Sequence, residues 1–380
     1  MRCPLIHFQF RLQRTDPLSD ARRGQVTTAH GPFETPAFMT VGTLGSVKGL
    51  PPWEVERTGA EVILGNTYHL YLRPGMEVIK TLGGLHRMMG WNRSILTDSG
   101  GYQVFSLATL RKIEEEGVTF RSHIDGSQHL LTPEKAVEIQ ETLGSDIMMV
   151  LDECPDKDRD SAYCLQSMER TTRWAMRCLE SRRSQNALFA IVQGGMHPEL
   201  RTRHAAELAG LPFDGWAVGG LSVGEERSVL MEMLSASIAE LPGDRPRYFM
   251  GLGKPGDILD AVRQGVDMFD CVLPTRSGRT GLLFTRNGEL VIKQARYRLD
   301  DSPVDPDCAC PVCRTFSRAY LRHLFVSREM LGPVLNTIHN LHFYQWMMAQ
   351  IRASIEAGTF VSLYNDLSAR VRRRMEPGEP

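Results

Sequence analysis

The sequence predicts an α/β fold: a (β/α)8 TIM barrel with an N-terminal cap of strands and a zinc-binding subdomain toward the C-terminus. Three observations support this prediction. Short apolar segments alternate about eight times with longer amphipathic segments, which is typical of parallel strands connected by helices. Most of the short segments end in a polar residue or a glycine. After about residue 300 the alternation stops, and three cysteines follow within six residues.

The N-terminal forty residues mix short apolar runs with Gly, Pro and Thr, and we expect strands there that cap a larger unit. The expected barrel strands are eight apolar or β-branched segments: Pro36–Val41, Glu61–Leu64, Ser94–Thr97, Ile147–Leu151, Leu188–Val192, Trp216–Val218, Arg247–Met250 and Met268–Asp270. A doubly wound sheet is the alternative, because strands are easily miscounted in a single sequence.

Amphipathic patterns between these strands predict helices at Thr132–Leu143, Ala162–Arg183, Pro198–Ala209, Ser228–Ala239 and Pro255–Gln264. Pro133 and Pro255 stand where the first turn of a helix tolerates proline. Two more helices, roughly Ser317–Glu329 and His342–Glu356, are expected after the cysteines. The arginine-rich end, Arg370–Arg374, is interpreted as a solvated helix face.

The residues that follow the expected strands form one group: Thr40, Asn66, Asp98, Asp152, Gln193, Gly220, Gly251 and Asp270. In a barrel these positions share the C-terminal rim, where active sites of this architecture lie. We therefore expect a pocket with at least three carboxylates. Taken alone, Asp98 could instead cap a helix, and Asp270 could simply pair with an arginine.

Residues 300–345 are predicted to form the zinc-binding subdomain, after a barrel unit of residues 1–299 and before C-terminal helices and a basic tail, 346–380. Cys308, Cys310 and Cys313 with His339 make a Cys3His set, which suits one structural Zn²⁺ in tetrahedral coordination. On spacing alone, His323 and His342 are alternatives for the fourth ligand. Because a saturated zinc cannot activate water, we do not expect this site to be catalytic.

Composition excludes other classes of protein. The formal net charge is −1, so any nucleic-acid site must be a local basic patch. No uninterrupted apolar stretch is long enough to span a membrane, and the N-terminus lacks the apolar region of a signal peptide. The cysteine cluster does not look like a disulfide framework. We expect a cytoplasmic protein without membrane contact.

Six features resemble the signature of the queuine/preQ1 tRNA-guanine transglycosylases, and they occur in that family's order. They are TDSGGYQVF at Thr97–Phe105, IVQGG at Ile191–Gly195, AVGGLSVGE at Ala217–Glu225, YFMGLGKP at Tyr248–Pro255, FDCVLPTR at Phe269–Arg276, and the set Cys308, Cys310, Cys313 and His339. The resemblance spans roughly residues 8 to 365 and favours His339 as the fourth ligand. It implies the same fold, a (β/α)8 barrel with an inserted zinc subdomain.

The resemblance implies an enzyme of queuosine biosynthesis that exchanges guanine at the wobble position of tRNA. Asp270 matches the family's nucleophile and Asp98 its general acid/base, which implies double displacement through a covalent Asp270–ribose intermediate. Cys154 and Val223 resemble the bacterial choices beside the base, which favours preQ1 over queuine. The family's tRNAs are the Asp, Asn, His and Tyr isoacceptors with GUN anticodons, and the enzyme commonly works as a homodimer with the zinc subdomain near the contact.

The resemblance also implies how the base is bound. Guanine and preQ1 share an edge with donors at N1 and N2 and an acceptor at O6. Asp152 accepts from the donors, whereas the Gln193 amide and the Gly220 N–H donate to O6. Tyr102 is expected to stack on the base. The expected pocket is completed by Asp98, Ser99, Gly100, Gly101, Leu221 and Met250.

The tRNA chain is expected to lie on two glycine- and arginine-containing segments. Glycines in Gly251–Asp257 allow the RNA backbone to approach closely, and arginines in Thr275–Arg279 can bridge bases and phosphates. The expected RNA-binding residues are Gly251, Leu252, Gly253, Lys254, Pro255, Gly256, Asp257, Thr275, Arg276, Ser277, Gly278 and Arg279. A wobble base lies in a single-stranded loop, so flipping it into a pocket costs only a few kcal/mol.

Two other functions share parts of this pattern. A non-catalytic RNA-binding subunit with the same fold would keep the zinc but would not need both Asp98 and Asp270. A retaining nucleoside or glycoside hydrolase could use the same carboxylates, but it would not need the zinc subdomain or Thr275–Arg279. Labelled guanine and tRNA distinguish these functions, because only a transglycosylase incorporates base without net hydrolysis.

Overall fold

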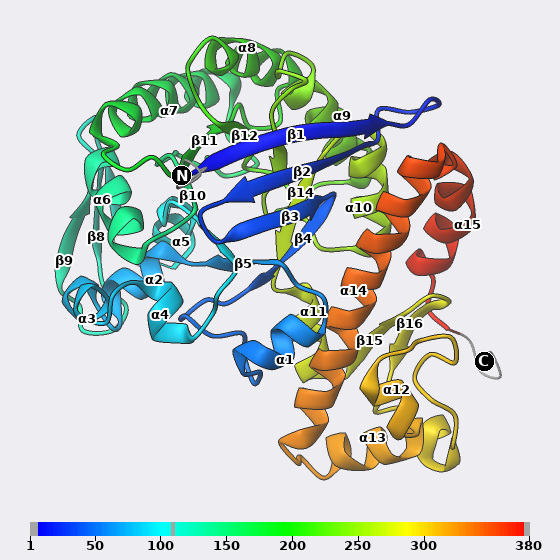
Figure 1. Ribbon diagram of the computed structural model, residues 1–380. Helices are drawn as coiled ribbons and strands as arrows, with labels where there is room; N and C mark the ends of the chain where they lie inside the picture. The colour runs from blue at the N-terminus through cyan, green and yellow to red at the C-terminus, as the bar shows by residue number, and fades with distance from the viewer. Residues whose placement is uncertain (1–6, 108–110, 376–380) are drawn as a thin grey trace, which may run out of the picture.

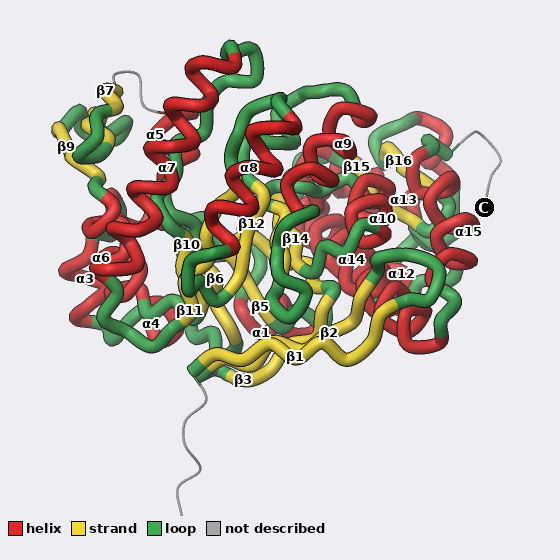
Figure 2. Tube along the Cα trace, turned by 90° about the horizontal axis from the view of Figure 1, so that it is seen from above, coloured by secondary structure: helices red, strands yellow, loops and turns green. Residues whose placement is uncertain are grey.

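The computed structural model describes residues 7–107 and 111–375, and its centre is a closed barrel of eight parallel strands (Figures 1 and 2). In order around the barrel these are β4 (Ala37–Val41), β5 (Val62–Gly65), β6 (Ser94–Thr97), β10 (Ile147–Met149), β11 (Ala187–Val192), β12 (Gly215–Val218), β13 (Arg247–Phe249) and β14 (Met268–Cys271). Phe269 of β14 pairs with Phe38 of β4 and closes the barrel. The predicted barrel is confirmed, and the doubly wound alternative is wrong.

The barrel strands are mostly apolar, since both of their faces are covered. Every residue of β11, for example, is buried. The helices outside the strands are α1 (Pro52–Arg57), α2 (Thr67–Leu72), α3 (Met76–Thr81), α4 (Leu85–Met89), α5 (Gly101–Leu107), α6 (Pro133–Leu143), α7 (Ser161–Ser181), α8 (Pro198–Ala209), α9 (Arg227–Ile238) and α10 (Pro255–Arg263). The five helices predicted in this region are confirmed to within two residues at each end.

Among the described residues, two antiparallel sheets of three strands each are added to the barrel. The first, β1 (Phe8–Thr15), β2 (Arg22–Thr28) and β3 (Gly31–Thr35), covers the N-terminal end of the strands, as expected for a cap (Figure 1). The second, β7 (Arg111–Ile113), β8 (Val118–Arg121) and β9 (Gln128–Leu131), lies between α5 and α6 in the chain and projects to one side (Figure 2).

The chain leaves the barrel after β14 and returns to it through one long helix. The intervening elements are α11 (Leu273–Thr280), β15 (Leu282–Thr285), β16 (Gly288–Val291), the 3₁₀ helix η1 (Ala295–Leu299), α12 (Pro311–Thr315) and α13 (Arg318–Val326). Helix α14 (Leu331–Ala357) then packs on α11 and β4, so it takes the place of the eighth barrel helix, and α15 (Phe360–Arg372) packs on α10 (Figure 1).

The helix expected at His342–Glu356 is wrong at its start, because α14 begins eleven residues earlier, at Leu331. Pro333 lies in its first turn, where proline is tolerated, and buried residues from Leu335 onward pack on neighbouring elements. The helix also runs without a break through residue 345, where a boundary is predicted. The division into three units remains a prediction.

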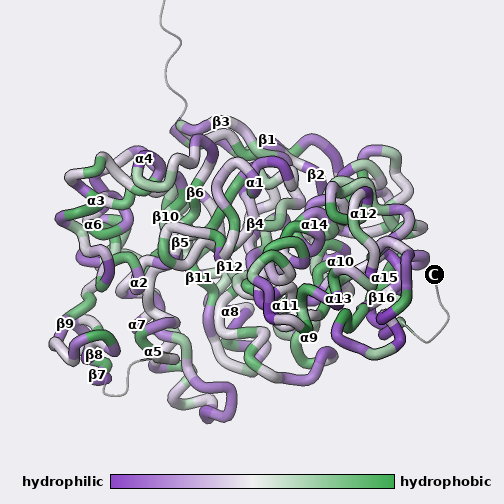
Figure 3. The backbone as a smooth tube through the Cα atoms, turned by 90° about the horizontal axis from the view of Figure 1, so that it is seen from below, coloured by the Kyte–Doolittle hydropathy of each residue, from purple (hydrophilic) through white to green (hydrophobic). Residues whose placement is uncertain are grey.

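Hydrophobic stretches follow the barrel strands, whereas hydrophilic stretches lie mostly on the outside (Figure 3). Among the described residues, no helix is long and apolar enough to cross a membrane.

The cap is joined to the barrel by a buried ion pair. Arg22 of β2 donates from Nε and Nη2 to the two carboxylate oxygens of Asp267, at 2.9 and 2.5 Å. Asp267 stands just before β14 and also accepts from the Arg247 backbone N–H at 2.7 Å. One carboxylate therefore connects the cap with two barrel strands.

We expect Asp267→Ala to lower the free energy of unfolding by about 3–5 kcal/mol, because it leaves the Arg22 charge buried without its partner. The control is Arg23→Ala on the same strand, whose more exposed pairs with Glu34 and Glu356 are worth about 0–1 kcal/mol. Urea unfolding measures both. Equal losses in the two variants would contradict the connecting role of Asp267.

Candidate active site

A cavity of about 680 Å³ opens at the C-terminal ends of the barrel strands. Of the rim residues expected there, seven line it: Asn66, Asp98, Asp152, Gln193, Gly220, Gly251 and Asp270. Thr40 is the exception. Strand β4 continues one residue further than this position, so Thr40 is buried within the strand and Val41 lines the cavity instead.

The carboxylate of Asp98 is held by three N–H donors. Its Oδ1 accepts from the Thr67 backbone at 2.8 Å, and its Oδ2 accepts from the side chains of Asn66 at 2.5 Å and Gln103 at 2.9 Å. These bonds favour the ionised form, but burial outweighs them and raises the pKa of Asp98 to about 6. The charge of Asp270 acts in the same direction.

Asp270, at the end of β14, is oriented by two donors. The Tyr248 hydroxyl donates to its Oδ1 at 2.5 Å, and the Gly251 backbone N–H donates to the same oxygen at 2.8 Å. Burial raises its pKa above the usual value. Because the pKa of Tyr248 is raised well above 10, chiefly by burial, this phenol stays protonated and can donate. The second oxygen of Asp270 is not needed for these bonds.

A second group of polar side chains lies across the same cavity. The Oδ1 of Asp152 accepts from the Ser99 hydroxyl at 3.2 Å, and its Oδ2 accepts from the Gln193 side-chain amide at 2.6 Å. Burial raises the pKa of Asp152 to about 6. Among the described residues, Gln193 Oε1 is buried without a hydrogen-bond partner. This group therefore combines the oxygens of one carboxylate with an amide, and the amide oxygen has no hydrogen-bond donor.

The other residues expected around a base lie close to this group. Tyr102, Leu221 and Met250 line the cavity, and Tyr102 is 51% exposed. Gly100 and Gly101 do not line it. A Cβ at Gly101 would lie 2.9 Å from the Asp152 carbonyl oxygen, so this glycine allows α5 to start directly beside Asp152.

The residues predicted to bind RNA divide into two sets. Those that line the cavity are Gly251, Leu252, Gly253, Lys254, Asp257 and Arg276. Those that do not are Pro255, Gly256, Thr275, Ser277, Gly278 and Arg279, and the first five of these are buried. Gly278 is packed against α14, where an added Cβ would lie 2.8 Å from the Thr337 backbone nitrogen.

The C-terminal arginines are not all solvated as predicted. Arg372 donates to Asp257 Oδ1 and to Asp260 Oδ2, both at 2.7 Å, and so ties α15 to α10. Its guanidinium also covers Gly256, since a Cβ there would lie 2.5 Å from it. The amphipathic pattern could not show this, because the carboxylates come from another helix.

The predicted metal ligands come together at the junction of α12 and α14. The Sγ atoms of Cys308, Cys310 and Cys313 lie 4.0, 3.6 and 3.3 Å from His339 Nδ1, and the set could hold a metal ion. His339 Nε2 lies 2.9 Å from the Phe284 carbonyl oxygen. A carbonyl only accepts, so Nε2 carries the proton and Nδ1 is left with a lone pair for a metal.

The sequence does not identify the contacts of two residues near the cavity. Tyr248 belongs to a recognised motif, but only the barrel shows that its hydroxyl reaches Asp270 from the neighbouring strand. Arg201 lies in the helix predicted at Pro198–Ala209, and its side chain is fully buried. The signal for Tyr248 is its position one residue before the end of β13. For Arg201 the signal is its helical spacing from Ala205 and Leu208, which are also buried.

The barrel and the cavity define a (β/α)8 enzyme with carboxylates at its mouth. The family profile described as queuine tRNA-ribosyltransferase matches residues 16–373. Relatives called queuine tRNA-ribosyltransferase include those of Solidesulfovibrio magneticus, 55% identical over 92% of this chain and 94% of that protein, and of Nitrosomonas eutropha, 56% identical over 90% and 94%. A third, from Sphingopyxis alaskensis, is 52% identical over 96% and 99%.

The chain belongs to the queuine tRNA-ribosyltransferase family. Membership confirms the family that the sequence motifs predicted. It also confirms the predicted class of enzyme, a tRNA-guanine transglycosylase of queuosine biosynthesis. The roles of individual residues remain predictions.

Asp152 provides a test of the electrostatics of the cavity. Its pKa in the folded protein, about 6, lies above the ordinary 3.8, so the ionised carboxylate opposes folding above pH 6 and imposes no such cost below pH 4. We expect Asp152→Asn to raise the free energy of unfolding by about 1–3 kcal/mol at pH 8 and to change it little near pH 4. Denaturant unfolding at both pH values measures the difference, with the exposed Asp244→Asn as control. A pH-independent effect of Asp152→Asn would contradict a raised pKa.

Proposed function

We propose that this protein exchanges guanine at the wobble position of tRNAs with GUN anticodons, those for Asp, Asn, His and Tyr, for preQ1. The observation that carries the proposal is that Asp98 and Asp270, from distant parts of the chain, line one cavity together with the polar side chains of Asp152 and Gln193. The two alternatives, a non-catalytic subunit and a small-substrate hydrolase, have less support. The first would not need both carboxylates, and family membership argues against the second.

The proposed reaction is a double displacement at C1′ of the ribose. An oxygen of Asp270 attacks C1′, the C1′–N9 bond breaks, and its electron pair leaves with guanine, which takes a proton from Asp98. The incoming base then loses a proton to Asp98 and attacks C1′ through its ring nitrogen. The bond between C1′ and Asp270 breaks, and the carboxylate is regenerated. Two inversions give net retention.

The environments of the two carboxylates support this division of roles. A pKa of about 6 allows Asp98 to give and take a proton near neutral pH. Asp270 is held by Tyr248 and Gly251 through one oxygen, which orients the carboxylate while the other oxygen remains available for attack.

The base would lie between Tyr102 and Met250, with its N1–H and N2–H donors on Asp152. Gln193 and the Gly220 N–H would donate to O6. Buried polar groups of this kind reject a base that leaves them unpaired.

Cys154 and Val223 also line the cavity, as the preference for preQ1 over queuine requires. Burial raises the pKa of the Cys154 thiol to about 12, so it would meet the substituent as a small neutral group.

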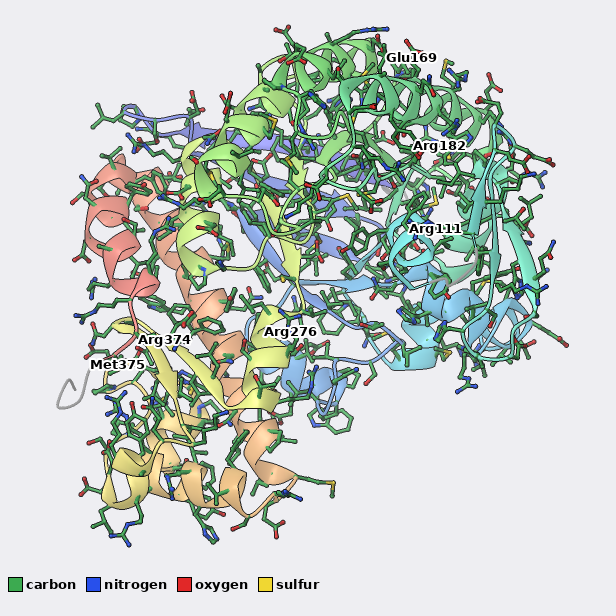
Figure 4. All side chains as sticks on the ribbon, turned by 180° about the vertical axis from the view of Figure 1, so that it is seen from behind. Arg111, Glu169, Arg182, Arg276, Arg374 and Met375 are labelled. Carbon is green, nitrogen blue, oxygen red and sulfur yellow. The ribbon has the colours of Figure 1, made fainter. Side chains whose placement is uncertain are left out.

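The tRNA would approach over the exposed cations beside Asp270. Lys254 and Arg276 are exposed and line the cavity, and Figure 4 shows Arg276 on α11, between the barrel and the zinc-binding segment. These two side chains would contact phosphates around the flipped nucleotide. On a protein with almost no net charge, such a patch provides local attraction.

The Cys3His set would hold one structural Zn²⁺. Three thiolates and one imidazole nitrogen match the preferred ligands of zinc and leave no position for water. When bound, the ion would stabilise the loop around Cys308 and Cys310 against α14, and it would take no part in the exchange reaction.

A homodimer and a cytoplasmic location complete the proposal. Exposed apolar side chains on and after α13, Tyr320, Val326, Met330 and Leu331, support a contact between two copies near the zinc-binding segment. A cytoplasmic location follows from the tRNA substrate.

The nucleophile is tested by trapping the covalent RNA intermediate in the absence of incoming base. We expect Asp270→Ala to form no adduct and to lose exchange by at least about 10³-fold, because no other group would attack C1′.

The matched control is Cys271→Ala, which removes the neighbouring cavity-lining thiol. Burial raises the pKa of that thiol to about 11, so it should be unreactive and the adduct should persist. Denaturing electrophoresis detects the adduct. Exchange by Asp270→Ala at the wild-type rate would refute the assignment.

The metal site is tested with Cys310→Ser. We expect bound zinc to fall from one ion per chain to well below one, and residues 300–345 to become the first sites of limited proteolysis, because the ligands no longer stabilise their loop. Cys178→Ser, a change at a buried cysteine outside the set, should retain the metal. Elemental analysis measures the zinc. Unchanged zinc in Cys310→Ser would count against the ligand set.

A further inference from the structure

Helix α8 directs a positive charge inward, below the ends of β11 and β12. The side chain of Arg201 is fully buried, and its three contacts are neutral oxygens. Within the described part of the chain, no carboxylate lies at ion-pair distance from it. Burial lowers its pKa to about 10, so it remains charged at neutral pH. A buried charge without a counterion costs on the order of several kcal/mol, which indicates a role beyond packing.

The guanidinium connects two turns at the rim of the cavity. Its Nε donates to the Gly195 carbonyl oxygen at 2.7 Å, and its Nη2 donates to the Gly219 carbonyl oxygen at 3.1 Å. Gly195 lies two residues after Gln193, and Gly219 directly precedes Gly220. One planar group therefore holds both segments that carry the proposed donors to O6.

These turns leave little room for movement. A Cβ at Gly194 would lie 2.9 Å from the Arg201 backbone nitrogen, and a Cβ at Gly220 would lie 2.5 Å from Gln193 Oε1. Gly220 also has a φ of 68°, in the left-handed region that favours glycine. The glycines bring the Gln193 side chain and the Gly220 peptide into direct contact, so the positions of the two depend on each other.

The same helix also holds the main chain of Gln193. Nδ1 of the buried His204 accepts from the Gln193 backbone N–H at 2.9 Å. Burial lowers the pKa of His204 to about 3, so this imidazole is neutral and can accept. Helix α8 thus fixes Gln193 from the backbone side, and Arg201 fixes the turn that follows.

We propose that Arg201 is a positioning residue for recognition of the O6 edge of the purine. By holding the turns after β11 and β12 together, it aims the Gln193 amide and the Gly220 N–H at one carbonyl oxygen of the base. Its charge also favours a base that carries partial negative charge on this oxygen. The inference rests on the proposed function, because it concerns a 6-oxopurine in this cavity.

Binding of two bases to Arg201→Met tests this role. Guanine carries O6, whereas 2-aminopurine has the same rings and 2-amino group but lacks both O6 and the N1–H that Asp152 would accept. We expect the Kd of guanine to rise about 10- to 100-fold, and that of 2-aminopurine to change by no more than about twofold. A parallel rise for both bases, or no change for either, would overturn the proposal, because a merely structural role does not distinguish them.

Two further variants complete the experiment. Ser237→Ala removes the third acceptor of Arg201, which belongs to α9 and does not line the cavity, so it should bind both bases like the wild type. Arg201→Lys retains the charge and most of the volume if the methionine variant does not fold. A single ammonium cannot span both carbonyls, so discrimination between the bases should fall here too. Wild-type discrimination in a folded lysine variant contradicts the inference.

Incorporation of guanine into tRNA by the wild-type protein is measured alongside. If the wild type does not exchange guanine, the proposed function fails. If it does so while the Arg201 variants retain full discrimination, only the role of Arg201 fails.

Discussion

Closure of the parallel barrel is the constraint on which the site depends. Around the barrel, β14 pairs with β4, which pairs with β5, which pairs with β6. This order brings Asp270 and Asp98 to the same rim, and Asn66, at the end of β5, donates directly to Asp98 between them. In an open sheet the strands that carry the two carboxylates could lie at opposite edges. The position of Asp270 therefore depends on the pairing of β14 with β4, whose register includes Asp270 itself.

Several buried polar groups line the cavity, although the core around it is apolar. Asp98 and Asp152 both have pKa values raised by burial, and within the described ranges neither has an arginine or lysine as a hydrogen-bonding partner. Neutral amides and hydroxyls hold them instead, so their charge is not cancelled before a substrate arrives. Among the described residues, Gln193 likewise keeps a buried oxygen without a partner. Buried polar groups that lack charged partners are typical of sites that bind polar ligands.

The sequence predicted the barrel well, because strands buried on both faces are apolar and their ends are polar. It also predicted Asp98, Asp152, Gln193 and Asp270 at one rim, since parallel strands share their C-terminal edge. The sequence did not predict the contacts of Arg201. Helical spacing places Arg201 on the same buried face of α8 as Ala205 and Leu208, and Arg203, which pairs with glutamates, on the opposite face. Which carbonyl oxygens a buried arginine meets depends on how the helix packs on the barrel, and periodicity does not show this.

Base exchange at a covalently held ribose is tested most directly by following labelled guanine and the glycosidic bond in one reaction. Purified protein is incubated with tRNA carrying a GUN anticodon and with radiolabelled guanine, and both incorporated label and abasic RNA are determined. If the two carboxylates converge on one ribose and hold it covalently, the label should enter the tRNA without forming abasic sites. Release of guanine with abasic RNA, or no incorporation by intact protein, would contradict an exchange reaction in this cavity.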